Sequence, residues 1–396
     1  MSDTPVIPYG RHHIDDDDVA AVVRVLRSDF LTQGPAVGEF ELALCRRLGA
    51  AHAVVVNSGT AALHVGMLAL GIGPGDLVIV PPITFVASAN AALYCGAEVA
   101  FVDVDPDTAL ISVEALEAFL ARYQGPRRPR AVVVVHYAGL PCDMSALNTV
   151  CLRHGLELIE DACHAPGGTW TDATGQVRTV GDASTSAFAA LSFHPVKHLT
   201  TGEGGAVMTA RRDLAERSRM FRTHGITRSP DLLMRREGPW WYEQQGLGFN
   251  YRMPDLLAAL GTSQLAKFDA WLARRRSIAD RYRAVLGELP GIGLHAVPAG
   301  RTHAYHLFPI LVERRAQVLA SLAGRGVRAQ VHYIPVHEQP YYQTRYGRQS
   351  LPGAEAWYAR EISIPMYPML TDRDVARVSE AVAQAVAATG SVAARS

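Results

Sequence analysis

Lysine is rare in this chain, and one of its lysines has an unusual setting. The sequence contains 38 Lys plus Arg residues, yet only Lys197 and Lys267 are lysine. A guanidinium stays protonated and forms no Schiff base, whereas a lysine amine in a low-dielectric site loses its proton readily. Lys197 lies in the stretch SFHPVKHLTTGEGG, among apolar residues, hydroxyls and glycines, with Glu203 as the one acidic neighbour. We therefore expect a lowered pKa and a nucleophilic amine at Lys197.

The other lysine is a useful contrast. Lys267 stands in SQLAKFDAWLARRRSIADRYR, a helical and strongly charged pattern. The pattern predicts a solvated amine on an apolar stem, with no chemical role.

Three more groups follow predicted buried strands. Asp161 closes the run LELIED, where a carboxylate can cap the next turn or meet a buried cation. The stretch NSGT at 57–60 joins a strand to a helix start, where free amides, the helix dipole and two hydroxyls form an anion site. Ser192 lies five residues before Lys197. Because ligands of open α/β sheets gather at the carboxyl ends of the strands, we expect these groups at one edge of a sheet.

Together these groups indicate a cofactor. Neither the dinucleotide fingerprint GxGxxG nor the nucleotide-binding motif GxxxxGK[ST] occurs. His164, His194 and His198 lack the spacing of zinc ligands, so no metal site is predicted. An amine that forms an imine, a carboxylate that keeps a pyridine nitrogen protonated and a cradle for phosphate match the requirements of pyridoxal 5'-phosphate (PLP).

Short apolar runs alternate with helical patterns through the first two thirds of the chain. The predicted strands are Ala53–Val56 and the runs that begin at Leu77, Val99, Ala131, Leu156, Ser186 and Gly205. This alternation predicts an α/β fold with a mostly parallel, seven-stranded sheet covered on both faces. A long helix is predicted from about Pro254 to Leu289, and AQVHYIPVH (329–337) is predicted to be a strand. We predict a large α/β domain with an N-terminal arm at 1–270 and a smaller α+β domain at 271–396.

Composition excludes several classes of partner. The formal net charge of the 396 residues is zero, which gives no electrostatic basis for binding nucleic acid or an anionic membrane. No stretch reaches transmembrane length. The five cysteines are odd in number and show no CxxC spacing, as expected for reduced thiols in a cytoplasmic protein.

Five blocks carry a resemblance to a known family. NSGTAAL, PPITFVASANAAL, EDACHAPGG, SFHPVKHLTTGEGGAV and GFNYRMPDLLAALG occur in the order found in the DegT/StrS sugar-nucleotide aminotransferases. The resemblance implies the aspartate-aminotransferase-like fold (fold type I) with PLP as cofactor. The stretches IPYGRHHI, SDFLTQGP, RTHGITR and AQVHYIPVH resemble in particular the branch of pseudaminic acid biosynthesis. That branch aminates C4 of a UDP-linked 4-keto-6-deoxy-N-acetylhexosamine.

The resemblance also implies roles for matched residues. Lys197 would form the Schiff base and shuttle a proton, while Asp161 would pair with the pyridinium nitrogen. Asn250 would reach the phosphate in a neighbouring subunit, which implies a homodimer with shared sites. The remaining cofactor contacts would be Gly59, Thr60 and Ser192 at the phosphate, Phe85 against the ring face and His164 beside the phenolic oxygen.

For the nucleotide sugar, the candidate contacts are Arg252, His332 and Tyr333, although ordinary packing explains each of them equally well. The implied reaction is a ping-pong transfer in which glutamate donates the amine. One alternative is transfer to another nucleotide-linked keto sugar, at C3 or C4 or on a dTDP or GDP carrier. A second alternative is a non-catalytic protein that binds PLP or the sugar nucleotide for regulation.

Overall fold

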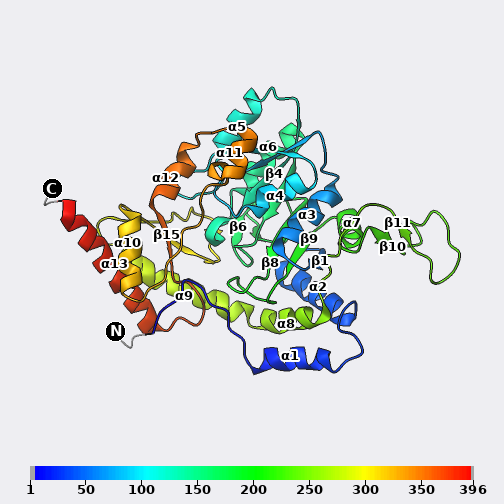
Figure 1. Cartoon of the computed structure of the whole chain (residues 1–396), viewed down its shortest axis with the longest axis horizontal. Helices are drawn as coiled ribbons and strands as arrows, with labels where there is room; N and C mark the ends of the chain where they lie inside the picture. The colour runs from blue at the N-terminus through cyan, green and yellow to red at the C-terminus, as the bar shows by residue number, and fades with distance from the viewer. Residues whose placement is uncertain (1–4, 394–396) are drawn as a thin grey trace.

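The computed structural model describes residues 5–393 and is built around one seven-stranded sheet (Figure 1). The strand order is β1-β9-β8-β5-β4-β2-β3. Only β9 runs antiparallel to its neighbours, β1 and β8, while the other neighbours pair in parallel. The predicted α/β fold and all seven predicted strands are confirmed. Their bounds are β1 His52–Val56, β2 Asp76–Val80, β3 Glu98–Phe101, β4 Arg128–Val135, β5 Glu157–Asp161, β8 Phe188–Ser192 and β9 Gly205–Thr209.

Both faces of the sheet are buried, which explains the unbroken apolar runs. Successive side chains of a strand point to opposite faces. In β1, Ala53 and Val55 belong to the core beneath helices α2 (Pro35–Leu48) and α6 (Met144–His154). Val54 and Val56 belong to a second core with α3 (Gly59–Leu70), α4 (Ala87–Tyr94) and α7 (Arg212–Arg222). If polar and apolar residues alternated along these strands, the polar side chains would all lie in one of the two cores.

Among the described residues no helix is long and apolar enough to cross a membrane.

The remaining elements surround this sheet or form the C-terminal part. The other helices are α1 Asp16–Leu26, α5 Val113–Arg122, α8 Asp255–Ala266, α9 Phe268–Leu286, α10 Arg315–Gly324, α11 Pro340–Tyr346, α12 Pro352–Arg360 and α13 Asp372–Ala393, with short 3-10 turns η1 Tyr137–Gly139 and η2 Val336–Glu338. Three small sheets comprise β12 Ile292–Leu294, β14 Phe308–Val312 and β15 Glu361–Ile364; β13 Arg301–Thr302, β6 Thr169–Thr171 and β7 Val177–Thr179; and β10 Ile226–Thr227 with β11 Glu243–Gln244.

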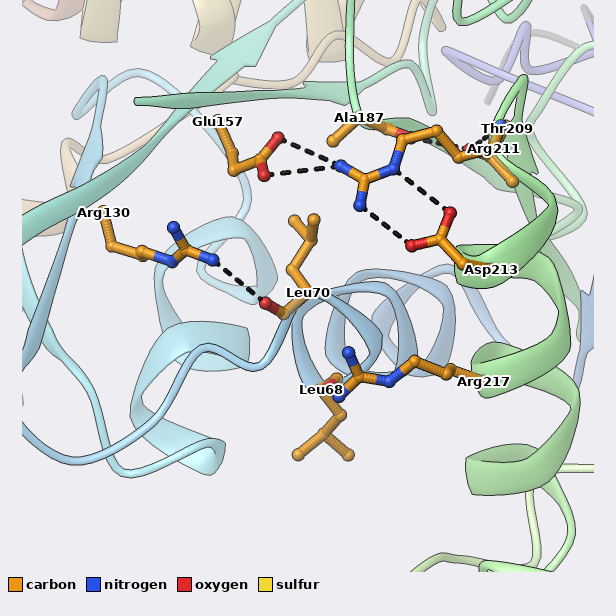
Figure 2. A network of polar contacts seen from close by, with 9 residues as sticks. All are labelled: Leu68, Leu70, Arg130, Glu157, Ala187, Thr209, Arg211, Asp213 and Arg217. Atoms are coloured by element: carbon orange, nitrogen blue, oxygen red, sulfur yellow. Dashed lines mark hydrogen bonds and ion pairs between the residues drawn. The ribbon is translucent and has the colours of Figure 1, made fainter. Parts of the chain in front are cut away.

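Helix α3 is fixed at both ends. At its start the Ser58 hydroxyl accepts a hydrogen bond from the Ala61 amide (3.1 Å). At its end Gly71 adopts a left-handed conformation, and the Leu68 and Leu70 carbonyls accept hydrogen bonds from Arg217 and Arg130 (Figure 2). Cations at a helix C-terminus complement the helix dipole. The polar network in Figure 2 thus holds α3 from the edge of the sheet opposite to the carboxyl ends of its parallel strands.

Arg211 extends this network across the same edge. Its guanidinium pairs with Glu157 at the start of β5 (3.3 Å) and with Asp213 in α7 (2.9 Å) (Figure 2). Each exposed ion pair contributes little to the stability of the fold on its own. Together the two pairs connect the sheet to α7, the helix that packs beside α3.

The prediction of a solvated Lys267 is wrong. Its amine pairs with Asp15 and, at 2.9 Å, with Asp18, whose side chain is fully buried. Asp18 also accepts a hydrogen bond from the Gln264 amide (2.6 Å). The predicted single helix from Pro254 to Leu289 is interrupted at this same residue, since α8 ends and α9 begins on either side of Lys267. Lys267 therefore joins α1 to the α8–α9 junction.

The predicted strand at AQVHYIPVH is also wrong. Only Gln330 forms a bridge, with Ser363, and the segment continues as irregular backbone into η2. The His332 amide donates to the Glu361 carboxylate (2.8 Å), so a side chain takes the place of a neighbouring strand. Within this segment His332 and Tyr333 line a cavity.

A third hydrophobic core lies in the C-terminal part. It is formed by α9, α10, α13, β14 and β15, and it also contains Ile7 from the N-terminal arm. In α9, Phe268 and Leu272 pack in the core of the large sheet, whereas Ile278 packs in this third core. The division at residue 270 stays a prediction, and Trp357 from the C-terminal part reaches back into the first core.

Candidate active site

A cavity of about 770 Å³ opens at the carboxyl edge of the parallel strands. Segments far apart in sequence meet there, from the N-terminal arm to the irregular stretch around His332. Nine of the eleven predicted site residues line it. They are Gly59, Thr60, Phe85, Asp161, His164, Ser192, Lys197, His332 and Tyr333.

Lys197 lies in a loop that leaves β8 and returns to β9. The loop is closed at its base by backbone hydrogen bonds from Phe193 to Gly204 and from Thr201 to Phe193 (both 2.9 Å). Burial lowers the pKa of Lys197 below its ordinary value, and this effect outweighs the nearby Cys163 and Asp161, which raise it. The expected direction of the pKa shift is confirmed, and a neutral amine is a nucleophile.

Asp161 ends β5 and points into the same cavity as Lys197. The Ser88 hydroxyl donates to one carboxylate oxygen (2.6 Å), and the Cys163 amide donates to the other (3.2 Å). The Ser88 hydroxyl in turn contacts that of Thr84 (2.6 Å). This buried chain of hydroxyls fixes the orientation of the carboxylate and is a feature that sequence reasoning missed.

The start of α3 forms a cradle for an anion. Strand pairing sets Val56 of β1 and Ser192 of β8 both opposite Gly205, so α3 begins beside Ser192. A Cβ atom on Gly59 would lie 2.9 Å from the Cβ of Ser192, and glycine is therefore required for this close approach. The Ser58 hydroxyl caps the Ala61 amide, and Gly59 and Thr60 of the first helical turn, whose amides have no partner within a helix, line the cavity.

Buried imidazoles cluster around the lysine. His164 shares a hydrogen bond with the Tyr333 hydroxyl (3.1 Å), and its ring centroid lies 4.4 Å from that of His306. Burial and then the charge of Lys197 hold the pKa of His164 well below its usual range. His164 is consequently a neutral imidazole, a point that the sequence left open.

His332 and Tyr333 form a further part of the cavity wall. The Nδ1 atom of His332 contacts the Ser363 hydroxyl (2.9 Å), and burial lowers the pKa of His332 to about 3. Tyr333 lies near Phe85, whose ring is 58% exposed and can therefore cover a planar ligand (centroids 6.2 Å apart). The wall is aromatic, with the polar atoms at its edge.

Two predicted residues do not line the cavity. Asn250 is exposed and forms a backbone bridge with Thr223, and Arg252 lies outside the lining as well. Among the lining residues that sequence reasoning missed are Tyr9 and His306. No local pattern signals them, because Tyr9 comes from the N-terminal arm and His306 from the segment before β14.

The cavity fits PLP. Its lining offers an amine of lowered pKa, an oriented carboxylate and a helix start that glycine leaves accessible. The Nδ1 atom of His164 is buried and has no hydrogen-bond partner within the described chain, so it is free to contact a ligand. These are the groups needed for the aldehyde, the ring nitrogen and the phosphate of that cofactor.

Comparisons with known proteins agree with this chemistry. The model of the DegT/DnrJ/EryC1/StrS aminotransferase family matches residues 12–383. The spore coat polysaccharide biosynthesis protein SpsC of Bacillus subtilis is 38% identical, with 95% of this chain and 96% of SpsC covered.

Two solved structures are similar over nearly their whole length. Helicobacter pylori PseC, an aminotransferase of pseudaminic acid biosynthesis, has 31% identity and a TM-score of 0.87, with 97% of this chain and all of PseC covered. The PLP form of Spr1654 of Streptococcus pneumoniae, named a putative sugar aminotransferase, has 28% identity and a TM-score of 0.87, with 97% of this chain and 99% of Spr1654 covered. Since the family match and these likenesses span almost the entire sequence, we conclude that this chain belongs to the DegT/DnrJ/EryC1/StrS aminotransferase family and is a PLP-dependent sugar aminotransferase.

Proposed function

We propose that the enzyme moves an amino group from glutamate to the C4 keto group of a UDP-linked 4-keto-6-deoxy-N-acetylhexosamine. The observation that carries the proposal is the convergence of Lys197, Asp161 and the start of α3 on one cavity. The narrower substrate is supported by the sequence blocks described above and by the likeness to PseC. The likeness to SpsC, a protein of polysaccharide biosynthesis, favours a second candidate, transfer to another nucleotide-linked keto sugar.

Lys197 is the proposed proton carrier. When bound, PLP supplies an aldehyde that bonds to amines and a ring that accepts electrons. Lys197 would hold the cofactor through its uncharged Nζ atom, which would replace the aldehyde oxygen, released as water. Once free, it can take the proton from Cα of glutamate and later deliver a proton to C4 of the sugar. Its lowered pKa supports this work near neutral pH.

Asp161 and the start of α3 are the proposed anchors of the cofactor. The carboxylate, held by Ser88, would keep the pyridine nitrogen protonated. Gly59, Thr60 and Ser192 would bind the phosphate through amides and hydroxyls at the positive end of the helix dipole. Phe85 would cover one face of the ring, and His164 would contact its phenolic oxygen.

The proposed sugar-binding residues are His332 and Tyr333, which line the cavity, and the ring of Tyr333 lies beside that of Phe85. Arg252 is a weaker candidate, since it lies outside the lining of this chain's own cavity. Asn250 is proposed to act in the site of a second subunit within a homodimer. Asn250 is exposed and is not among the residues that line its own cavity, which is consistent with that role.

The proposal is tested by following both half-reactions. Addition of glutamate to the PLP-loaded enzyme should convert its visible absorbance to that of the amine form of the cofactor. A coupled assay with UDP-linked 4-keto sugars of the altro and gluco series should then show amine transfer. Transfer to a dTDP-linked acceptor alone would overturn the UDP assignment, and an unchanged spectrum would favour the regulatory alternative.

The chain provides its own matched control for Lys197. Lys197→Arg should abolish turnover, because arginine cannot form the bond to the aldehyde. Lys267→Arg changes the only other lysine and preserves its charge, so this variant should keep turnover close to that of the wild type. Retained turnover in Lys197→Arg would refute the mechanism.

A further inference from the structure

His306 touches the amine of Lys197. The Nε2 atom of His306 lies 3.4 Å from Nζ of Lys197. The ring is 3% exposed and lies between those of His164 and His198, whose centroids are 4.4 and 5.9 Å away. The two contacting residues are separated by 109 positions, so tertiary structure alone creates this contact.

The backbone on both sides of His306 is firmly held. Ala304 donates to the Gly139 carbonyl (2.8 Å), and Leu307 donates to that of Ala138 (3.1 Å). The buried guanidinium of Arg275 donates to the carbonyls of Tyr305 (3.0 Å), His306 (3.4 Å) and Met366 (3.1 Å). These hydrogen bonds fix the backbone that carries the imidazole, and the buried ring is packed between those of His164 and His198, so the contact with the lysine is a built one.

Burial decides which ring nitrogen carries the hydrogen. The Nδ1 atom of His306 is buried and has no hydrogen-bond partner among residues 5–393. An orphaned N–H group is rarer in folded proteins than an orphaned acceptor, so the hydrogen belongs on Nε2. Nε2–H then points at Nζ of Lys197, and only an uncharged amine has a lone pair to accept it.

Burial and the groups around His306 favour an uncharged ring. The groups that act on His306 are Lys197, His164, His198 and Arg275, and together with burial they hold its pKa well below the usual range. The groups facing Lys197 are Cys163 and Asp161, which raise its pKa, and burial outweighs them. Burial and the cationic groups around His306 thus disfavour a charged imidazole, and the ring is a neutral donor.

We propose that His306 is a positioning residue that donates a hydrogen bond from Nε2 to the uncharged amine of Lys197 and holds this amine while it is free of cofactor and substrate. The inference rests on the proposed role of Lys197. It adds His306 to the residues of the site, and it assigns to His306 the selection of the uncharged form of Lys197. A purely structural histidine would fill the same space without discriminating between the two forms of the lysine.

The chain's lysine content allows a direct measurement. Full-length protein freed of PLP is treated with limiting acetic anhydride over a range of pH, and acetylation is read by mass spectrometry. Lys197 is followed, and Lys267 is the internal reference. His306→Leu removes the donor, whereas His306→Gln retains an amide N–H. His337→Gln is the matched control, because His337 is a buried histidine outside the cavity lining.

In His306→Leu we expect the labelling midpoint of Lys197 to rise by roughly 0.5–1 pH unit, the effect of losing one hydrogen bond to the neutral amine. His306→Gln and His337→Gln should stay near the wild type. An unchanged or lowered midpoint in His306→Leu, or equal shifts in His306→Leu and His306→Gln, would overturn the proposal.

A second measurement does not depend on the variants' folding. NMR of wild-type protein labelled with 15N-histidine should show the Nε2–H tautomer for His306 across the neutral range of pH. An Nδ1–H tautomer or an imidazolium there would overturn the proposal. Protection of Lys197 from acetylation by added PLP tests the role of the lysine separately. If protection fails, the proposed function falls; if protection holds while the midpoint does not move, only the inference about His306 falls.

Discussion

At the scale of single residues, the site depends on a buried side chain, that of Ser88, which does not line the cavity. Asp161 is oriented by Ser88, which is fully buried and hydrogen-bonded in turn to Thr84. A carboxylate that could rotate would lose its alignment with a ring nitrogen. Hydrogen bonds to a charged group contribute about 1.5–3 kcal/mol, more than those between neutral groups. The affinity for the cofactor should therefore respond to a buried hydroxyl.

We predict that Ser88→Ala weakens PLP binding about tenfold or more, since a loss of 1.4 kcal/mol corresponds to a factor of ten. Titration of the cofactor-free protein, followed by absorbance, measures the dissociation constant. Ser218→Ala is the matched control, because the Ser218 hydroxyl is buried without a hydrogen-bond partner in the described residues. Equal affinities for Ser88→Ala and wild type would show that the hydroxyl does not position Asp161.

At the scale of elements, the geometry of the anion cradle depends on how closely β9 approaches the start of α3. A Cβ atom on Gly205 would lie 2.4 Å from the Ser58 carbonyl oxygen and 2.7 Å from the Gly59 nitrogen. Both contacts involve backbone, which has little room to yield in a packed core. The strand and the helix start must therefore separate to admit a side chain.

Gly205→Ala should lower stability by about 1–3 kcal/mol, as overpacking does, and should also weaken PLP binding. Gly38→Ala in α2 is the control, since a Cβ there meets nothing within 4 Å and alanine favours a helix by up to about 1 kcal/mol. Urea unfolding and PLP titration distinguish the two. Unchanged cofactor affinity in a destabilised Gly205→Ala variant would separate the packing of β9 from the function of the cradle.

At the scale of the whole molecule, Lys267 fastens the N-terminal helix to the body. Its amine pairs with Asp15 and Asp18 of the capping turn of α1, at the junction of α8 and α9. The hydrogen bond from Lys267 is the main cause that holds the pKa of Asp15 below its ordinary value. A carboxylate with a lowered folded pKa stabilises the protein above its unfolded pKa, and this contribution is lost as pH falls through the folded pKa.

Lys267→Met should lower the free energy of unfolding by about 3 kcal/mol at neutral pH, because it leaves the buried Asp18 without its cation. Lys267→Arg should restore most of the loss. Urea titrations of the three proteins, repeated toward acid pH, should show the wild-type advantage shrinking as Asp15 is protonated. An advantage that grows in acid would contradict this assignment of the ion pair.

The sequence alone determined the fold class and most of the cavity. Apolar runs such as the valines of β4 predict a strand buried on both faces, since few other structures tolerate so little polar surface. Asp161 could be found because it ends such a strand, and Lys197 because it lies in the loop after another, since strand ends converge in this fold. The chemistry of an amine or a carboxylate follows from the residue type alone.

Only the tertiary structure decided which side chains support these residues. The contacts of Lys197 with His306 and of Asp161 with Ser88 join positions 109 and 73 residues apart. The irregular backbone at His332 and the pairing of Lys267 with Asp18 likewise depend on groups that approach from distant segments. Local sequence sets propensity and burial pattern, whereas a buried charge or an imidazole tautomer is set by the few atoms that folding brings within hydrogen-bond distance.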